Sequence, residues 1–155
     1  MKRIMLVAVM ALFMNLTISS QNAYFEKLQD IEGIEYINLD KSMMEAAFKA
    51  SNPDADLSDG LDLEEVTIIM VDKEDEKKAT KKTEKLLKKT LKDGFAAVVD
   101  VKEEDDKIKV YCKDIANDRN EYIVCYNSDE DLIILLVRGK LEASEAKNMI
   151  KVEFE

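Results

Sequence analysis

Apolar residues recur along the chain at two spacings, one typical of helices and one typical of strands. Residues 23–31 (AYFEKLQDI) place their apolar side chains at helical spacing and predict a first helix that ends before Gly33. Residues 34–39 (IEYINL) alternate between apolar and polar, which predicts a short strand. A second helix is predicted in the segment KSMMEAAFKA, with Asp40 or Ser42 as its N-terminal cap.

The rest of the chain is richer in strand-like runs. Residues 66–71 (VTIIMV) are mostly apolar and mostly β-branched, and predict a strand. The longest helix is expected over about 73–93, between Asp72 as its cap and Gly94 as its terminator. A short helix over about 142–150 ends the predicted order. Between these two helices lie four more strand-like runs, at 95–102, 107–113, 121–127 and 131–138.

This order of elements predicts an α+β fold, with residues 21–155 forming a single domain. Runs of strands joined by short turns favour an antiparallel or mixed sheet of about five to six strands, with helices packed on one face. The run LIILLV at 132–137 is apolar on both of its sides, so we expect it at the centre of the sheet.

The N-terminus has the three parts of a secretory signal peptide. Two basic residues at 2–3 precede an apolar run at 4–13, and small polar residues follow at 17–20. The apolar run is too short for a membrane span, which needs about 20 residues; the alternative is a buried N-terminal helix. We expect residues 1–20 to be removed and the chain to be exported to the periplasm, the outer envelope or the extracellular space. No cysteine lies near this junction, so a lipid anchor through a lipobox cysteine is not expected.

The expected mature chain is strongly acidic. The full sequence has 155 residues and a net charge of −10. Removal of residues 1–20 takes away two basic residues and no acid, which leaves 21 basic against 33 acidic residues and a net charge of −12. Nucleic acid and anionic membranes bind basic surfaces, so neither is an expected partner. No later segment is long enough to span a membrane, and the expected partner is an envelope protein or ligand.

Cys112 and Cys125 are the two cysteines of the chain. In an oxidising compartment an even pair of cysteines predicts a disulfide. A hairpin centred between Asp118 and Arg119 places the two directly opposite each other, nearly within bonding distance. The alternative is two free cysteines buried as small apolar residues. Reactive chemistry is not expected, because the chain has neither a CxxC motif nor a histidine.

The same hairpin register predicts a row of tyrosines. Tyr111 opposes Tyr126 in it, and Tyr122 lies further along that face. Such a row on a polar sheet face is a candidate partner-binding surface. The alternative is ordinary cross-strand aromatic pairing that stabilises the sheet.

Residues 54–65 invite comparison with a calcium-binding loop. Asp54, Asp56 and Ser58 occupy alternate positions, and Glu65 falls twelfth. An EF-hand needs glycine at the sixth position, where this chain has Asp59. These four residues are therefore weak metal candidates, and a solvated acidic loop is the favoured interpretation.

The helix predicted over 73–93 carries nine lysines. A solvated helix face is the simpler interpretation of this pattern, and a charge-complementary protein partner is the functional alternative.

Few catalytic mechanisms fit the composition. The chain has no histidine, which removes imidazole bases and most zinc sites. No P-loop, GxGxxG or GxSxG motif occurs, so no nucleotide cofactor is implied. Paired carboxylates, as in glycoside hydrolases, remain, but no pair is singled out. We identify no catalytic residue.

Three stretches carry a family resemblance: YFEKLQDIEGIEYINLDKSMM, VTIIMVDKEDEKKATKKTEKLL, and KIKVYCKD with EYIVCYNSDEDLIILLVRGKLEASE. With them the chain resembles the exported Bacteroidetes proteins classed as domain of unknown function 4252. The resemblance implies a periplasmic or outer-envelope setting and no defined activity. The preferred hypothesis is a non-enzymatic binding protein of the envelope; the alternatives are a carboxylate-based hydrolase of glycans and a calcium-binding exported domain.

Overall fold

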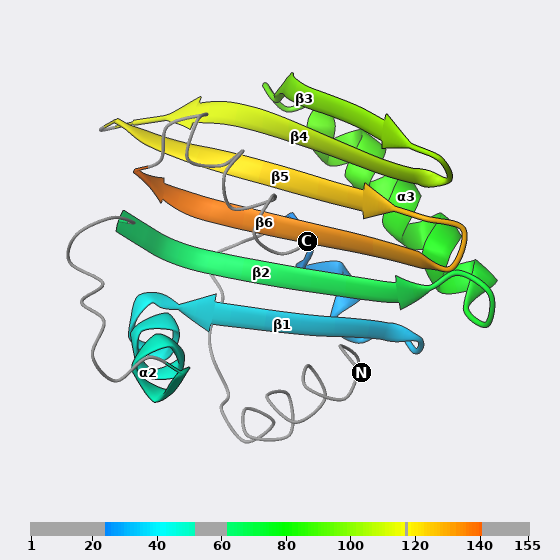
Figure 1. Cartoon of the computed structure of the whole chain (residues 1–155), viewed down its shortest axis with the longest axis horizontal. Coiled ribbons are helices and arrows are strands. Elements are labelled where there is room, and N and C mark those ends of the chain that lie inside the picture. Colours follow the sequence, from blue (N-terminus) through cyan, green and yellow to red (C-terminus); the bar gives the residue numbers. More distant parts are fainter. Residues whose placement is uncertain (1–23, 52–61, 117, 141–155) are drawn as a thin grey trace.

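A computed structural model describes residues 24–51, 62–116 and 118–140, which build a six-stranded sheet in the order β1-β2-β6-β5-β4-β3 (Figure 1). Every neighbouring pair of strands is antiparallel. The strands are β1 (Ile34–Asp40), β2 (Asp62–Asp72), β3 (Ala96–Glu103), β4 (Asp106–Ile115), β5 (Arg119–Asn127) and β6 (Asp131–Lys140). The helices are the short 3-10 helix η1 (Glu26–Leu28) and the α-helices α2 (Lys41–Ser51) and α3 (Lys77–Leu91).

The strands from β3 to β6 form a meander in chain order, and β2 joins β6 from the other side. The apolar strand β6 therefore lies in the interior of the sheet, paired with β2 and β5. The two edges are β1 and β3 (Figure 1).

The expected α+β fold with helices packed on one face is wrong, because the sheet dominates and the described residues form only two α-helices. Residues 23–31 satisfy helical spacing, but from Tyr24 on they fold as turns and a 3-10 helix. Helix α2 lies at one end of the β1 edge, so α3 is the one described α-helix that crosses a face of the sheet (Figure 1). The helix predicted over 142–150 and the signal peptide predicted at 1–20 lie outside the described residues.

Helix α3 begins later than expected. Asp72 was the predicted cap, but its carboxylate accepts the backbone N–H groups of Glu74 and Asp75, at 2.9 and 3.1 Å. This local hydrogen bonding forms a turn, as is common for aspartate. The helix proper therefore starts at Lys77.

One face of the sheet packs against α3 and the N-terminal segment (residues 24–33), and we call it the helix face. Helix α3 turns Ala79, Thr83 and Leu87 toward the strands, and all three are buried. Phe25 and Leu28 of the N-terminal segment are buried in the same core. The buried strand residues of this core are Ile69 and Val71 of β2, Ile123 and Cys125 of β5, and Leu132, Ile134 and Leu136 of β6.

The opposite side of the sheet, the second face, is apolar as well. Directly paired residues of antiparallel strands share a face, so the register traces rows of side chains across the sheet. One row on the second face consists of Ile37, Ile68, Leu135, Val124, Val110 and Val99, from β1 to β3. Val110 is fully buried and Val124 is 6% exposed, so this face holds a second core. Apolar residues on both sides explain the continuous apolar run of β6.

The β4–β5 hairpin has a different register from the expected one. Ile115 pairs with Arg119, which leaves a three-residue connection. Its last residue, Asp118, has φ +57, the left-handed conformation typical of such connections. Pairs in this hairpin are shifted by three residues from the prediction. Because the shift is an odd number, residues expected on one face lie on opposite faces.

Asp40 caps helix α2. Its Oδ1 atom accepts the backbone N–H of Met43 at 2.9 Å and the hydroxyl of Ser42 at 2.8 Å. The N–H of Met43, followed by the Ser42 hydroxyl, lowers the pKa of Asp40 from its usual value. The sequence offered Asp40 or Ser42 as the cap, and Asp40 performs this role.

Replacement of the cap, Asp40→Ala, should reduce the free energy of unfolding by about 1 kcal/mol at neutral pH, the usual cost of losing an N-cap. A carboxylate whose pKa is lowered on folding stabilises above its unfolded pKa and loses this contribution as the pH falls through the folded value. The difference between wild type and D40A should therefore shrink below about pH 4. Urea unfolding at several pH values measures it. Asp40→Asn is the control, since asparagine also caps helices; an equal loss in both variants would contradict the capping role.

Candidate functional site

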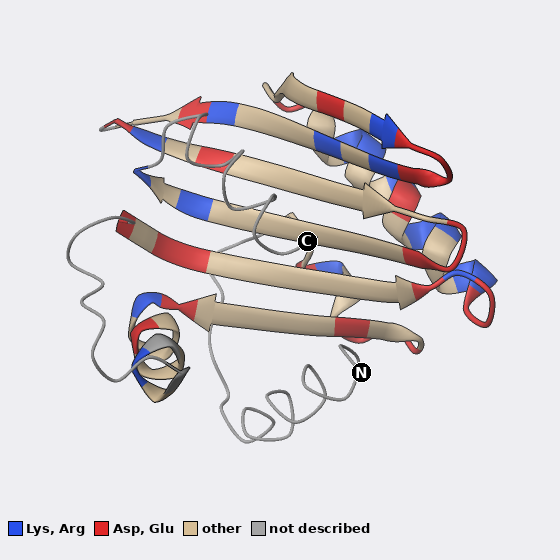
Figure 2. Ribbon diagram, viewed as in Figure 1, with Lys and Arg blue, Asp and Glu red and all other residues tan. Residues whose placement is uncertain are grey.

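Five charged residues form a row across the helix face, and we call them the charged row. They are Asp40, Glu65, Arg138, Glu121 and Lys113, one from each of β1, β2, β6, β5 and β4. Each is the direct cross-strand partner of the next, so their signs alternate along the row apart from the two acids at the β1 end (Figure 2). The row crosses five of the six strands at the end of the sheet where α2 begins.

Arg138 is the centre of the charged row. Its Nη2 and Nε atoms donate to Oε1 of Glu121 at 2.6 and 3.0 Å. Its Nη1 atom lies 3.6 Å from Oε2 of Glu65. The other oxygen of Glu65 accepts the side-chain amide of Asn38 at 2.7 Å. A single guanidinium group thus holds two carboxylates from the strands on either side of it.

Glu121 is the most buried member of the charged row, with 4% of its surface exposed. Its Oε1 atom is bound by Arg138, but its Oε2 atom is buried and has no hydrogen-bond partner among the described residues. A buried acceptor without a donor is costly, and a buried carboxylate without its counter-ion is more so. Glu121 therefore depends on Arg138.

The β4 end of the charged row ties three separate segments together. Lys113 donates to Asp93 Oδ2 and to the Tyr24 hydroxyl, each at 2.9 Å, and that hydroxyl donates to Asp93 at 2.9 Å. The Lys113 ammonium group also lies 5.5 Å from the ring centres of Tyr24 and Phe95. The bonds from Lys113 and Tyr24 hold the pKa of Asp93 below its usual value. This group anchors the N-terminal segment and the end of α3 to the sheet.

The charged row is not arranged as a pair of glycosidase carboxylates. Such a pair must flank the bond to be cleaved, with room for a sugar ring between them. Here the Arg138 guanidinium lies between Glu65 and Glu121 and binds both. The geometry is that of a structural ion network.

The acidic residues proposed for calcium are mostly outside the described part of the chain. Asp54, Asp56 and Ser58 lie there, so the calcium prediction stays a prediction. Glu65 belongs to the charged row, where it contacts Asn38 and Arg138. Within the described ranges, no group of three or more acidic or cysteine side chains is placed to hold a metal ion.

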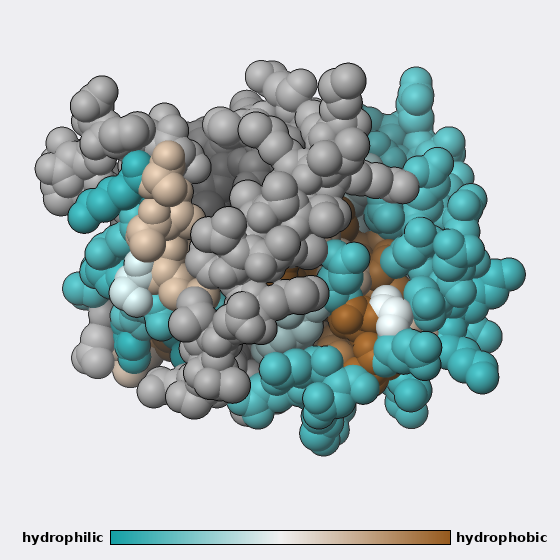
Figure 3. Space-filling model, turned by 90° about the horizontal axis from the view of Figure 1, so that it is seen from below, coloured by the Kyte–Doolittle hydropathy of each residue, from teal (hydrophilic) through white to brown (hydrophobic). Residues whose placement is uncertain are grey.

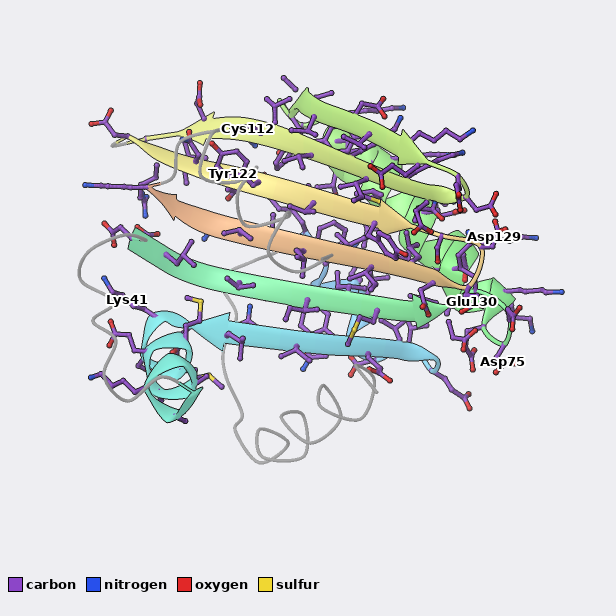
Figure 4. All side chains as sticks on the ribbon, in the orientation of Figure 1. Lys41, Asp75, Cys112, Tyr122, Asp129 and Glu130 are labelled. Atoms are coloured by element: carbon purple, nitrogen blue, oxygen red, sulfur yellow. The ribbon has the colours of Figure 1, made fainter. Side chains whose placement is uncertain are left out.

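The shifted hairpin register separates the two cysteines. Cys112 pairs with Tyr122 on the second face, and these two side chains lie beside each other in Figure 4. Cys125 pairs with Lys109 on the helix face. Both cysteines are free, so the expected disulfide between them is not formed in the structure.

The tyrosine row is divided in the same way. Tyr111 pairs with Ile123 on the helix face, whereas Tyr122 and Tyr126 lie on the second face. Tyr122 is only 2% exposed and belongs to the second core. The three side chains do not form the shared contact surface that the expected register predicts.

The outer side of α3 is a continuous lysine surface, and we call it the lysine face. Every exposed position of the helix is a lysine, while its buried positions are alanine, threonine and leucine. In the part of the chain that the structure describes, none of these lysines forms an ion pair. The lysine face consists of Lys77, Lys78, Lys81, Lys82, Lys85, Lys88 and Lys89.

Acidic residues gather near one end of α3, whereas Glu84 is the one acidic residue within the helix. They concentrate in the turns at 72–76, 103–106 and 128–131, which meet at one end of the sheet (Figure 2). Asp75, Asp129 and Glu130 are labelled there in Figure 4, with Lys41 at the opposite end. Seen from the β1 side, hydrophilic side chains cover this end, and apolar ones gather beside it (Figure 3). Many of the described acidic residues therefore lie in the turns at this end of the sheet and not along α3.

Loss of the central cation, Arg138→Leu, should reduce the free energy of unfolding by about 3 to 5 kcal/mol, because it leaves Glu121 buried and unpaired. The matched control is Arg119→Leu, which removes a half-exposed pair with Glu64 at 2.9 Å and should cost below about 1 kcal/mol. Urea unfolding gives both values. The double variant R138L/E121L should recover part of the loss, and equal effects of R138L and R119L would argue against the dependence of Glu121 on Arg138.

The chain unfolded without reductant should show two reactive thiols. In the folded chain Cys125 should react slowly at neutral pH, because burial raises the pKa of its thiol to about 11. Titration with a chromogenic thiol reagent before and after unfolding gives the number of reactive thiols in the folded and in the unfolded chain. Cys112→Ser should leave one thiol, and an unfolded chain that reacts only after reduction would contradict the free cysteines.

Comparison with known proteins agrees with the sequence resemblance. The profile of the family described as Domain of unknown function (DUF4252) matches residues 24–149, which include every described residue. No curated protein and no solved structure matches the chain. Within residues 24–51, 62–116 and 118–140, no helix has the length and apolar character needed to cross a membrane. The match over most of its length shows that the chain belongs to the DUF4252 family.

Proposed function

We propose that this chain is an exported, non-catalytic binding protein of the cell envelope that holds an acidic segment of a partner protein on the lysine face of α3. The observation that carries the proposal is that every exposed position of α3 is a lysine, in a chain with a net charge of −10. The three-part pattern at residues 1–20 supports export.

The lysine face is unfavourable for the helix on its own. Like charges four residues apart destabilise a helix by about 0.2 to 0.5 kcal/mol per pair. Lys77 and Lys81, Lys81 and Lys85, and Lys85 and Lys89 are such pairs. Glu84, beside Lys88, is the one acidic residue within α3. A partner that supplies carboxylates would relieve this repulsion, which gives the association a physical driving force.

The shape of the lysine face suits an extended or helical acidic segment. From Lys77 to Lys89 the face spans about 18 Å along the helix axis, at 1.5 Å per residue. Lysine ammonium groups are flexible point charges and do not require the fixed fork geometry of arginine. They therefore suit carboxylates in varied positions, and the acidic remainder of the chain repels anions that approach elsewhere.

Neutralising three lysines on the face, K81Q/K85Q/K88Q, should weaken binding of a polyglutamate peptide about tenfold or more, if each lost contact contributes about 0.5 kcal/mol. Fluorescence anisotropy with a labelled peptide at low and physiological salt measures the affinity. Binding should weaken as salt increases, because exposed charges are screened.

The matched control is K27Q/K49Q/K140Q, which changes the net charge equally at three exposed lysines outside α3. It should alter the affinity less than about threefold, since these lysines are scattered. Equal losses in the two triple variants, or no binding of polyglutamate by the wild type, would refute a role of the lysine face. A DNA oligomer that binds as tightly as polyglutamate would refute a protein partner.

A further inference from the structure

Strand β3 is an exposed edge of the sheet. Among the described strands it pairs with β4 alone, and it lies at the outer limit of the sheet (Figure 1). Seven of its eight residues are exposed, and only Val99 is half-buried. Val98 and Val101 are 38% and 40% exposed, and they are the large apolar side chains exposed to this degree among the described residues. Both of them lie on this one edge strand.

The two edges of the sheet are protected to different degrees. Proteins usually shield edge strands with proline, bulges, charges or a covering element. The other edge, β1, is half-buried along most of its length and has α2 at its end. Strand β3 has no proline, and its bulge lies between Ala97 and Val99. From Val99 to Glu103 it pairs regularly with β4, so its outer side there presents a straight row of backbone groups that no other described strand pairs with.

The segment from Val99 to Glu103 is complementary to itself. An antiparallel pairing of two copies centred on Val101 sets Asp100 of each copy opposite Lys102 of the other. Two cross-strand pairs of opposite charge then flank a pair of exposed valines, a favourable combination in sheets. Asp100 is exposed and forms an ion pair with Lys109 at 3.5 Å, and Lys102 is exposed.

Charge also favours the antiparallel arrangement. The turn after β3 carries Glu103, Glu104, Asp105 and Asp106. A two-fold axis at Val101 moves the two acidic turns to opposite ends of the interface, each beside the uncharged residues 96–98 of the other copy. A parallel pairing would bring the two turns together, and like charges at an interface cost several kcal/mol.

We propose that two copies of this chain associate through antiparallel pairing of their β3 edges about a two-fold axis at Val101, which joins the two sheets into one continuous sheet. The interface is isologous, so it closes after two copies and does not propagate into a filament. The dimer is independent of the lysine face, which lies on α3.

Sedimentation equilibrium tests the proposal, on chain expressed from its full coding sequence and purified as the cell leaves it. The wild type should shift from monomer to dimer between about 1 and about 200 µM, the range of a small interface. Val101→Lys places two ammonium groups at the axis and should raise the dissociation constant about 100-fold. Val98→Lys adds the same charge beside the acidic turn of the other copy, where it meets no ammonium group, so it should not raise the dissociation constant.

A charge swap tests the register directly. Asp100→Lys should weaken the dimer, because it sets a second ammonium group opposite Lys102 of the other copy, and the double variant D100K/K102D should restore it. A monomeric wild type at the highest concentration, or equal effects of V98K and V101K, would overturn the proposal. Amide hydrogen exchange of the wild type tests the dimer without any variant, so the test still holds if a variant fails to fold. Protection of β3 amides should rise with concentration while β1 amides stay unchanged, and concentration-independent exchange of β3 would overturn the dimer.

Discussion

The register of the sheet depends on the charged row, because apolar residues cover both faces. In a sheet with one polar face, a slip by one residue would turn a core set of side chains into solvent, so the hydrophobic pattern fixes the register. Here a slip of β6 would exchange one apolar set for another, as the run LIILLV shows. It would also move Arg138 away from Glu121 and Glu65, leaving buried charge unpaired. The ion pairs of Arg138 therefore specify a strand register that apolar burial alone would not fix.

The strands were predictable from local pattern, whereas the helices and the hairpin register were less so. Residues 34–39 and the four later runs became strands at close to the expected positions, because alternation and β-branching act locally. The helix predicted over residues 23–31 was wrong, because the turns that bury Phe25 and Leu28 space their apolar side chains as a helix does. The expected β4–β5 register missed the three-residue connection, whose last residue, Asp118, has a positive φ that the sequence pattern does not specify.

The two charged features differ in how far sequence could predict them. The lysines of α3 were visible in the sequence as a cluster. Once the structure shows which positions of the helix are buried, helical geometry places all the exposed lysines on one side. The charged row was not visible, since the contact of Arg138 with Glu121 and that of Glu65 with Asn38 join residues that lie 17 and 27 positions apart. Its signal is two basic and three acidic residues within the strands, such as Arg138 in the apolar strand β6, and only the strand order shows which of them meet.

A helix whose solvent side is entirely lysine is also the part of the molecule that amine-directed reagents modify first. Succinimidyl crosslinkers would acylate the lysine face and remove the charges that we propose hold a partner. A crosslinking experiment with such reagents would therefore abolish the interaction that it is meant to detect. Carbodiimide coupling activates the carboxylates of the partner and joins them to these same amines. Zero-length crosslinking of that type is therefore the suitable way to capture the proposed complex.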